Sequence, residues 1–196
     1  MARTWQSMGG LAVAVGLALT VAGPAQAAPQ PTLTNGGFET GDFTGWTQTG
    51  NTSFNGVQCP GPGSTVAQGN CSAFFGPVGS TGGITQNITG LINGDFYTLS
   101  FAFLPDGGNP SSFSATFDGL TLVNLTNPSA SAAFQNFSFV VRANGTSVPL
   151  SFNFRDDPGF LFLDAVAAQV PEPASLALIG TGLVGLFVGR RRKAPK

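Results

Sequence analysis

The sequence predicts an all-β domain between two terminal targeting segments. Between residues 28 and 169, apolar residues recur at every second position in several runs, the pattern of half-buried strands. No stretch in this range has the period of a helix, and clusters of Gly, Pro, Asn and Asp separate the runs. The chain therefore divides into an N-terminal segment (1–27), a central β domain (28–169) and a C-terminal segment (170–196).

The strongest alternation begins at Tyr97 and continues through Leu99, Phe101 and Phe103; residues 112–117, 137–141 and 150–154 repeat it. One apolar and one polar face per strand favours antiparallel sheets packed against each other. We expect an antiparallel jelly-roll sandwich of about nine or ten strands. Turn residues lie between the runs, at Asn93-Gly94-Asp95, Asp106-Gly107-Gly108-Asn109-Pro110, Asn127-Pro128, Asn144-Gly145 and Asp157-Pro158-Gly159.

Residues 1–27 have the three parts of a secretory signal peptide. Arg3 supplies a positive start, Leu11–Val21 is uncharged, and Ala25 and Ala27 form a small-x-small cleavage site. The mature chain is then expected to begin at Ala28. An uncleaved anchor is the alternative, although the apolar run is shorter than the ~20 residues of a spanning helix.

Residues 170–196 read as a short Pro-rich motif (170–173), a transmembrane helix (174–189) and a basic cytoplasmic stop (190–196). Sixteen helical residues span about 24 Å, and basic side chains at the end can extend the span by snorkelling. The basic cluster should stay in the cytoplasm, which places the β domain outside the inner membrane. A plain tail anchor is the alternative. The cluster consists of Arg190, Arg191, Arg192 and Lys193.

The order Pro-Glu-Pro, apolar helix, Arg cluster resembles the PEP-CTERM tail of bacterial surface proteins. The resemblance implies that the membrane protease-transpeptidase exosortase recognises Pro171, Glu172 and Pro173. It also implies a precursor tethered transiently to the inner membrane and a final place at the cell surface or outside the cell. This tail type is also labelled an ice-binding protein C-terminal domain, but no repeated Thr array supports ice binding.

The charge of residues 28–169 excludes several functions. Two basic and eight acidic residues give this domain a net charge of −6, which argues against nucleic acid as a partner. The chain has no His, so neither a Ser–His nor a Cys–His pair can form. Asp156 and Asp157 are adjacent and would point to opposite faces of a strand, so a turn or a cation-facing loop is favoured over a glycosidase pair. We expect a protein that is not an enzyme.

Cys59 and Cys71 are the only cysteines, and an exported chain with an even number favours a disulfide between them. The loop that they would close contains Cys59-Pro60-Gly61-Pro62-Gly63-Ser64, which has little capacity to pack. Two free buried thiols are the alternative.

Asn35 to Trp46, Gly83 to Ile88, Gly94 to Phe101 and Phe162 to Val166 resemble strands of galactose-binding-like and carbohydrate-binding-module jelly rolls. This resemblance implies a structural calcium held by Glu39 and Asp164, with oxygen ligands of the kind Ca²⁺ prefers. The alternative is that Glu39 ends a strand and Asp164 accepts local hydrogen bonds. The single Trp and the single Tyr of the domain, Trp46 and Tyr97, are expected to pack in the core.

These observations together predict an exported protein of the cell surface or extracellular matrix. It would be sorted by exosortase and have a structural or weak glycan-interacting role in an exopolysaccharide or biofilm. The alternative is a dedicated carbohydrate-binding module or a glycan-modifying enzyme.

Overall fold

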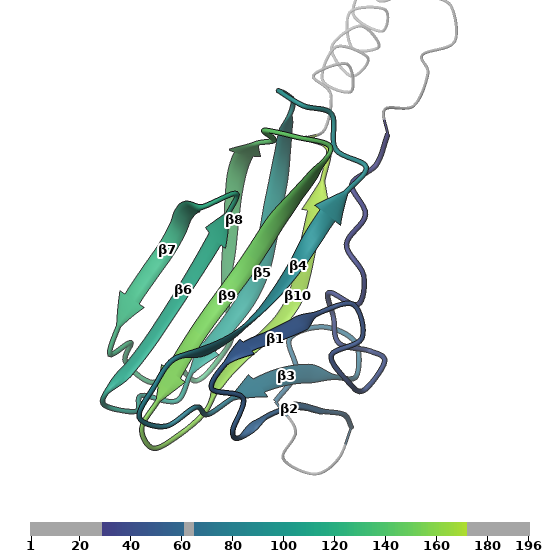
Figure 1. Ribbon diagram of the computed structural model, residues 1–196. Helices are drawn as coiled ribbons and strands as arrows, with labels where there is room; N and C mark the ends of the chain where they lie inside the picture. The colour runs from purple at the N-terminus through teal and green to yellow at the C-terminus, as the bar shows by residue number, and fades with distance from the viewer. Residues whose placement is uncertain (1–28, 61–64, 172–196) are drawn as a thin grey trace, which may run out of the picture.

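Ten β-strands form two five-stranded sheets in the computed structural model, which describes residues 29–60 and 65–171 (Figure 1). One sheet has the strand order β1-β4-β9-β6-β7 and the other has the order β2-β3-β10-β5-β8, with every pairing antiparallel. The strands are β1 (Thr47–Gly50), β2 (Asn55–Gln58), β3 (Ser72–Phe75), β4 (Gly82–Thr89), β5 (Phe96–Pro105), β6 (Ser111–Phe117), β7 (Leu120–Thr126), β8 (Gln135–Arg142), β9 (Ser147–Asp156) and β10 (Leu161–Gln169). The predicted all-β sandwich is confirmed.

Phenylalanine rings join the two sheets. In β6, every second residue from Ser111 to Phe117 is buried, as the alternation of the sequence requires. Phe113 of β6 stacks on Phe103 of β5 with ring centroids 3.9 Å apart. Phe75 of β3 stacks on Phe154 of β9 at 3.8 Å. Because each pair contains one ring from each sheet, the apolar faces of the two sheets pack together in a shared aromatic core.

The predicted turns all fall between strands, but several edge elements were not predicted. β1 is exposed along its whole length, and β7 lacks strict alternation between buried and exposed residues. Edge strands bury little surface on either face, so their hydrophobic pattern is weak. The hairpin that joins β6 to β7 turns at Asp118, whose φ is +51°, and Gly119, whose φ is +75°.

A β-bulge interrupts β10 beside β5. Asp164 lies opposite Ala102 and Ala167 lies opposite Ser100, so β10 has one extra residue in this interval. Ala165 takes up the extra length with a φ of +53°. The bulge lets Asp164 and Ala167 both point to the outer face of the sheet, away from the aromatic core.

The two ends of the described domain leave it on the same side. In Figure 1, the purple segment that begins at residue 29 and the yellow end of β10 both lie at the upper end of the sandwich. The loops that join β5 to β6 and β9 to β10 lie at the lower end. The sandwich therefore has an upper end near both chain connections and a lower end remote from them.

The predicted signal peptide and its cleavage positions (Ala25, Ala27 and Ala28), as well as Glu172, Pro173, the membrane segment and the basic stop, lie outside the described residues. Pro171 is described and is half-buried. Between residues 29 and 171, apart from 61–64, no helix is long and apolar enough to cross a membrane.

Candidate functional site

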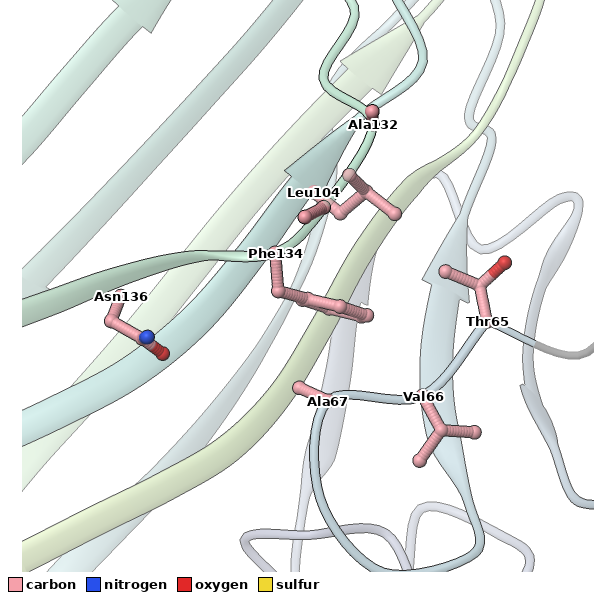
Figure 2. Close-up of a pocket in the computed structure, with 8 residues that line it drawn as sticks. Thr65, Val66, Ala67, Leu104, Ala132, Phe134 and Asn136 are labelled. Carbon is pink, nitrogen blue, oxygen red and sulfur yellow. The ribbon is translucent and has the colours of Figure 1, made fainter.

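An open hollow of about 540 Å³ lies on the outer face of the sheet that contains β5 and β8 (Figure 2). Residues 65–67 form one side, and residues 132–136, which lead into β8, form the other. Leu104 of β5 lies between them, and Figure 2 shows the ring of Phe134 reaching toward Ala67. The hollow is lined by Thr65, Val66, Ala67, Leu104, Ala132, Ala133, Phe134 and Asn136.

A second hollow of about 320 Å³ continues along the same face and shares Asn136 with the first. It follows the strand register, because Ser100 lies opposite both Ser138 of β8 and Ala167 of β10. We call the two hollows together the outer groove. The second hollow is lined by Gln68, Ser100, Phe101, Asn136, Phe137, Ser138, Ala165, Ala167 and Gln169, so none of the described lining residues of the outer groove is charged.

The Cys59–Cys71 disulfide predicted from the sequence is present, and it closes the loop that forms one wall of the outer groove. Two polar side chains hold the same loop. The Nε2 group of Gln58 donates to the carbonyl oxygen of Thr65 at 2.8 Å. The hydroxyl of the buried Ser72 donates to the same oxygen. The wall therefore has covalent and hydrogen-bonded anchors on β2 and β3.

Asp164 anchors the wall from beneath. Its Oδ2 atom accepts hydrogen bonds from the backbone amides of Ala67, at 2.8 Å, and Gln68, at 3.0 Å. Its Oδ1 atom accepts from the amide of Ala165 at 2.6 Å. Burial raises the pKa of the Asp164 carboxyl, and these three amides oppose that rise because they favour the ionised form. Only the bond from Ala165 is a local hydrogen bond of the kind expected if Asp164 binds no calcium; the other two come from a loop distant in the sequence.

Glu39 holds the end of the same loop. Its Oε1 atom accepts from the amides of Asn70, at 2.9 Å, and Cys71, at 3.1 Å, and these bonds lower the pKa of Glu39. Glu39 and Asp164 flank Gly37: a Cβ atom at Gly37 would lie 3.9 Å from Glu39 Oε1 and 3.9 Å from Asp164 Oδ1.

The two predicted calcium ligands are therefore brought together, and their chemistry fits a hard cation. The carbonyl oxygen of Gly36 already accepts the amide of Val166 at 2.9 Å, which leaves it one lone pair for a metal. In the described part of the chain, no three carboxylate or thiol side chains converge on one position. A calcium ion here needs backbone carbonyls or water for most of its ligands, and the assignment remains a prediction.

The structure confirms that Trp46 and Tyr97 pack in the core. Trp46 is 7% exposed, and its Nε1 donates to the carbonyl of Asn35. Tyr97 is 2% exposed, and its hydroxyl accepts from the amide of Ile92. Three aromatic residues line the outer groove, and Phe134 is the one among them that does not belong to the core; the sequence analysis missed it. The alternation of the sequence contains a signal for this position. Phe134 is an odd number of residues from the core-facing Phe137, so it shares a face with residues 136 and 138, which line the groove.

Asp156 and Asp157 point apart, as predicted. Asp157 Oδ2 accepts from Nη2 of Arg155 at 2.6 Å, and this interaction lowers the pKa of Asp157. Asp156 does not lie in a turn, which corrects the sequence interpretation. It is the last residue of β9, its amide donates to the carbonyl of Pro77, and its side chain continues the inward alternation of Phe154.

Comparisons with known proteins agree with the sequence motif and the fold. Residues 169–193 match the PEP-CTERM protein-sorting motif, so the chain carries this sorting signal. The structure resembles the carbohydrate-binding module TmCBM61, determined in complex with beta-1,4-galactotriose, with a TM-score of 0.59 and 18% identity, covering 71% of this chain and 97% of that one.

A second solved structure is the C-terminal family 22 carbohydrate-binding module of Clostridium thermocellum Xyn10B, with a TM-score of 0.51, 17% identity, and 72% and 98% coverage. The enzymatically active domain of tailspike protein 4 from bacteriophage CBA120 matches with a TM-score of 0.54 and 16% identity, over 71% of this chain but only 21% of that one. A search of curated proteins finds no match. These likenesses establish a jelly-roll fold of the kind found in carbohydrate-binding modules.

Proposed function

We propose that the protein is a non-enzymatic exosortase substrate of the cell surface or extracellular matrix, whose outer groove binds a neutral polysaccharide of an exopolysaccharide or biofilm. The observation that carries the binding proposal is an open groove, with no charged residue among its described lining residues, in a domain whose net charge is −6. An acidic domain repels anionic polymers, whereas an uncharged groove imposes no such cost on a neutral chain.

The polar groups of the outer groove suit sugar hydroxyls. Asn136 and Gln68 each offer an amide donor and an amide acceptor, and Ser100 and Ser138 offer hydroxyls side by side on β5 and β8. Phe134 supplies an apolar ring that can lie against the C–H face of a pyranose. A small number of polar groups that can fix the orientation of a ligand is typical of small-ligand sites.

The same composition supports a binding role without catalysis. Among the described residues that line the outer groove, none is an Asp, Glu, Lys, Arg, Cys or Tyr. Glycoside hydrolysis generally uses two carboxyl groups on either side of the bond that breaks. The carboxylates nearest the groove wall, Asp164 and Glu39, accept backbone hydrogen bonds from that wall instead.

The shape of the domain supports a role at a surface. Residues 29 and 171 lie at the upper end, and the first hollow lies against Leu104, near the end of β5 that points to the lower end. If the precursor is tethered through residues beyond Pro171, the first hollow lies toward the end of β5 remote from the attachment point, and the second hollow extends from it to Gln169. This arrangement leaves the first hollow free to contact a polymer before and after any release.

Glycan binding is tested with the full chain, purified in a mild detergent, on a panel of neutral and anionic polysaccharides. We expect binding to a neutral polymer, weakened about tenfold by Phe134→Ala, a loss within the range of one aromatic contact. Phe54→Ala is the control, because Phe54 is an exposed phenylalanine ring that lies outside the outer groove. Binding that is absent, or equally weakened by both variants, would refute the assignment of the groove.

Sorting is tested by the intact mass of the native protein from cell-surface and medium fractions. A species that starts at Ala28 and ends near Pro171–Pro173 would support export followed by exosortase processing. A species that retains residues 190–196 would mean that the tail is a membrane anchor. Loss of the short form in cells without exosortase is the matched control for other proteases.

A further inference from the structure

The carboxyl group of Asp156 is buried without an N–H or O–H donor from the described residues. The residue is 0% exposed, and neither Oδ1 nor Oδ2 accepts a hydrogen bond from a backbone amide or a neutral or basic side chain. Buried carboxylates in folded proteins are normally paired with a cation or with several donors. The two acceptor oxygens of a carboxylate require hydrogen-bond donors, a proton or a cation.

A second carboxylate lies beside it. Asp106, in the loop after β5, accepts the amide of Gly108 on Oδ1 at 3.1 Å and the amide of Phe160 on Oδ2 at 2.6 Å. A Cβ atom added to Gly108 would lie 1.6 Å from Asp156 Oδ1, so Gly108 touches both carboxylates. Burial, the hydrogen-bonding contact between the two carboxyl groups, and the charges of Asp106 and Asp157 raise the pKa of Asp156 to about 7.

A third oxygen faces the same place. Ser111, the first residue of β6, lies directly opposite Asp156 of β9 in the antiparallel pair, so their side chains share the inner face of the sheet. Ser111 is buried, and its hydroxyl also has no hydrogen-bond partner. Unpaired oxygens therefore come from two strands, while Asp106 is exposed to solvent.

No basic side chain in the described domain balances these two carboxylates. Its only basic residues are Arg142 and Arg155. Arg155 pairs with Asp157, and its side chain points away from Asp156. Arg142 lies opposite Phe96 at the start of β5, which is the other end of the strand that leads to Asp106, and it donates to the carbonyl of Gly94.

We propose that Asp106, Asp156 and Ser111 bind a calcium ion at the lower end of the sandwich, separate from Glu39 and Asp164. Ca²⁺ accepts carboxylate, hydroxyl and carbonyl oxygens and needs six to eight of them, so backbone carbonyls and water complete the shell. The ion ties the end of β9 and the start of β6 to the β5–β6 loop. It neutralises charge that the chain itself leaves unpaired at the end remote from both chain connections.

The test is calcium titration of the full chain by calorimetry after removal of metal with EDTA. The Glu39→Gln/Asp164→Asn double variant serves as the background, because it removes the other predicted calcium ligands. We expect one Ca²⁺ per chain in this background, with no binding after Asp156→Asn is added. Asp106→Asn should weaken binding at least about tenfold, because it removes a charged ligand. Asp95→Asn, another exposed carboxylate, is the control and should change nothing.

Two outcomes overturn the proposal. One is no calcium binding in the background variant, or binding that Asp156→Asn leaves unchanged. The other is calcium binding that Asp106→Asn leaves unchanged, which would show that Asp106 is not a ligand. If Asp156→Asn fails to fold, as judged by circular dichroism, Gly108→Ala provides the second variant. Its Cβ enters the space at Asp156 Oδ1 and should also abolish calcium binding.

Discussion

Removal of the disulfide should lower stability by an amount that the loop length determines. Cys59 and Cys71 are 12 residues apart, and a closed loop of about this size contributes roughly 3 kcal/mol by restricting the unfolded chain. That is a large part of the 5–15 kcal/mol typical of a domain. We expect Cys59→Ala/Cys71→Ala to unfold at a urea concentration lower by about 1.5 M, for a slope of about 2 kcal/mol per M. Alanine is chosen because Cys71 is buried and serine would bury a hydroxyl.

The native loop should survive this change. Gln58 and Asp164 hold it through backbone hydrogen bonds that the double variant leaves intact. The disulfide therefore acts on the unfolded state and the hydrogen bonds act on the folded state, so glycan binding in the outer groove should change little in conditions where the variant is folded.

The assay is equilibrium urea unfolding, followed by the fluorescence of Trp46, with and without a thiol reductant. The reductant should reduce the stability of the wild type to that of the double variant and should leave the variant unchanged. A wild type that does not respond to reductant would show that the bond is absent in solution. A loss below about 1 kcal/mol with the bond present would refute the chain-entropy reasoning.

Three further changes test the core and the loop anchors. Phe113→Ala should lower the free energy of unfolding by about 4 kcal/mol, because the ring is buried and contacts four other rings. Phe139→Ala should lower it by about half as much, because Phe139 is half-buried. Equal losses in urea unfolding would contradict the assigned core. Gln86→Ala should lower the free energy of unfolding by about 2 kcal/mol. The side-chain amide of this buried residue accepts from the backbone amide of Thr34 at 2.6 Å and donates to the carbonyl oxygen of Thr34 at 2.9 Å. An unchanged unfolding midpoint would show that these two bonds do not stabilise the fold. If calcium binds between Glu39 and Asp164, EDTA should lower the melting temperature of the wild type more than that of the Glu39→Gln/Asp164→Asn variant, and equal shifts would exclude the site.

Much of the fold could be predicted because the central strands carry a clear alternation. Phe113, Ala115 and Phe117 are buried as their spacing requires, and the Asn-Gly and Asp-Pro-Gly sequences lie in turns. The edge strands β1 and β7 could not be found in this way, since most of their residues are exposed and therefore need not alternate between apolar and polar types. The pairing of β9 between β4 and β6 joins residues far apart in the chain, and no local pattern encodes it.

The candidate site was harder to predict than the fold. The sequence singled out Glu39 and Asp164 through a resemblance, and the structure places both at the loop that walls the outer groove. The sequence did not single out Phe134 or Asn136. Their role depends on where the segment before β8 lies relative to the loop that the disulfide closes, and these two segments are about 70 residues apart in the chain.

The sequence by itself determined the properties that depend on local order and composition. These are the sorting motif, the absence of histidine, the net charge of the domain, the alternation that makes strands and the pair of cysteines. Only the tertiary structure decided which polar groups share a surface and which are left without partners. Asp156 looked like a turn residue beside Asp157, yet it lies buried against Ser111 and near Asp106, because strand pairing brings three distant segments to one end of the sandwich. Burial and pairing are properties of the folded neighbourhood, and they decide whether a carboxylate is solvated, hydrogen-bonded or in need of a cation.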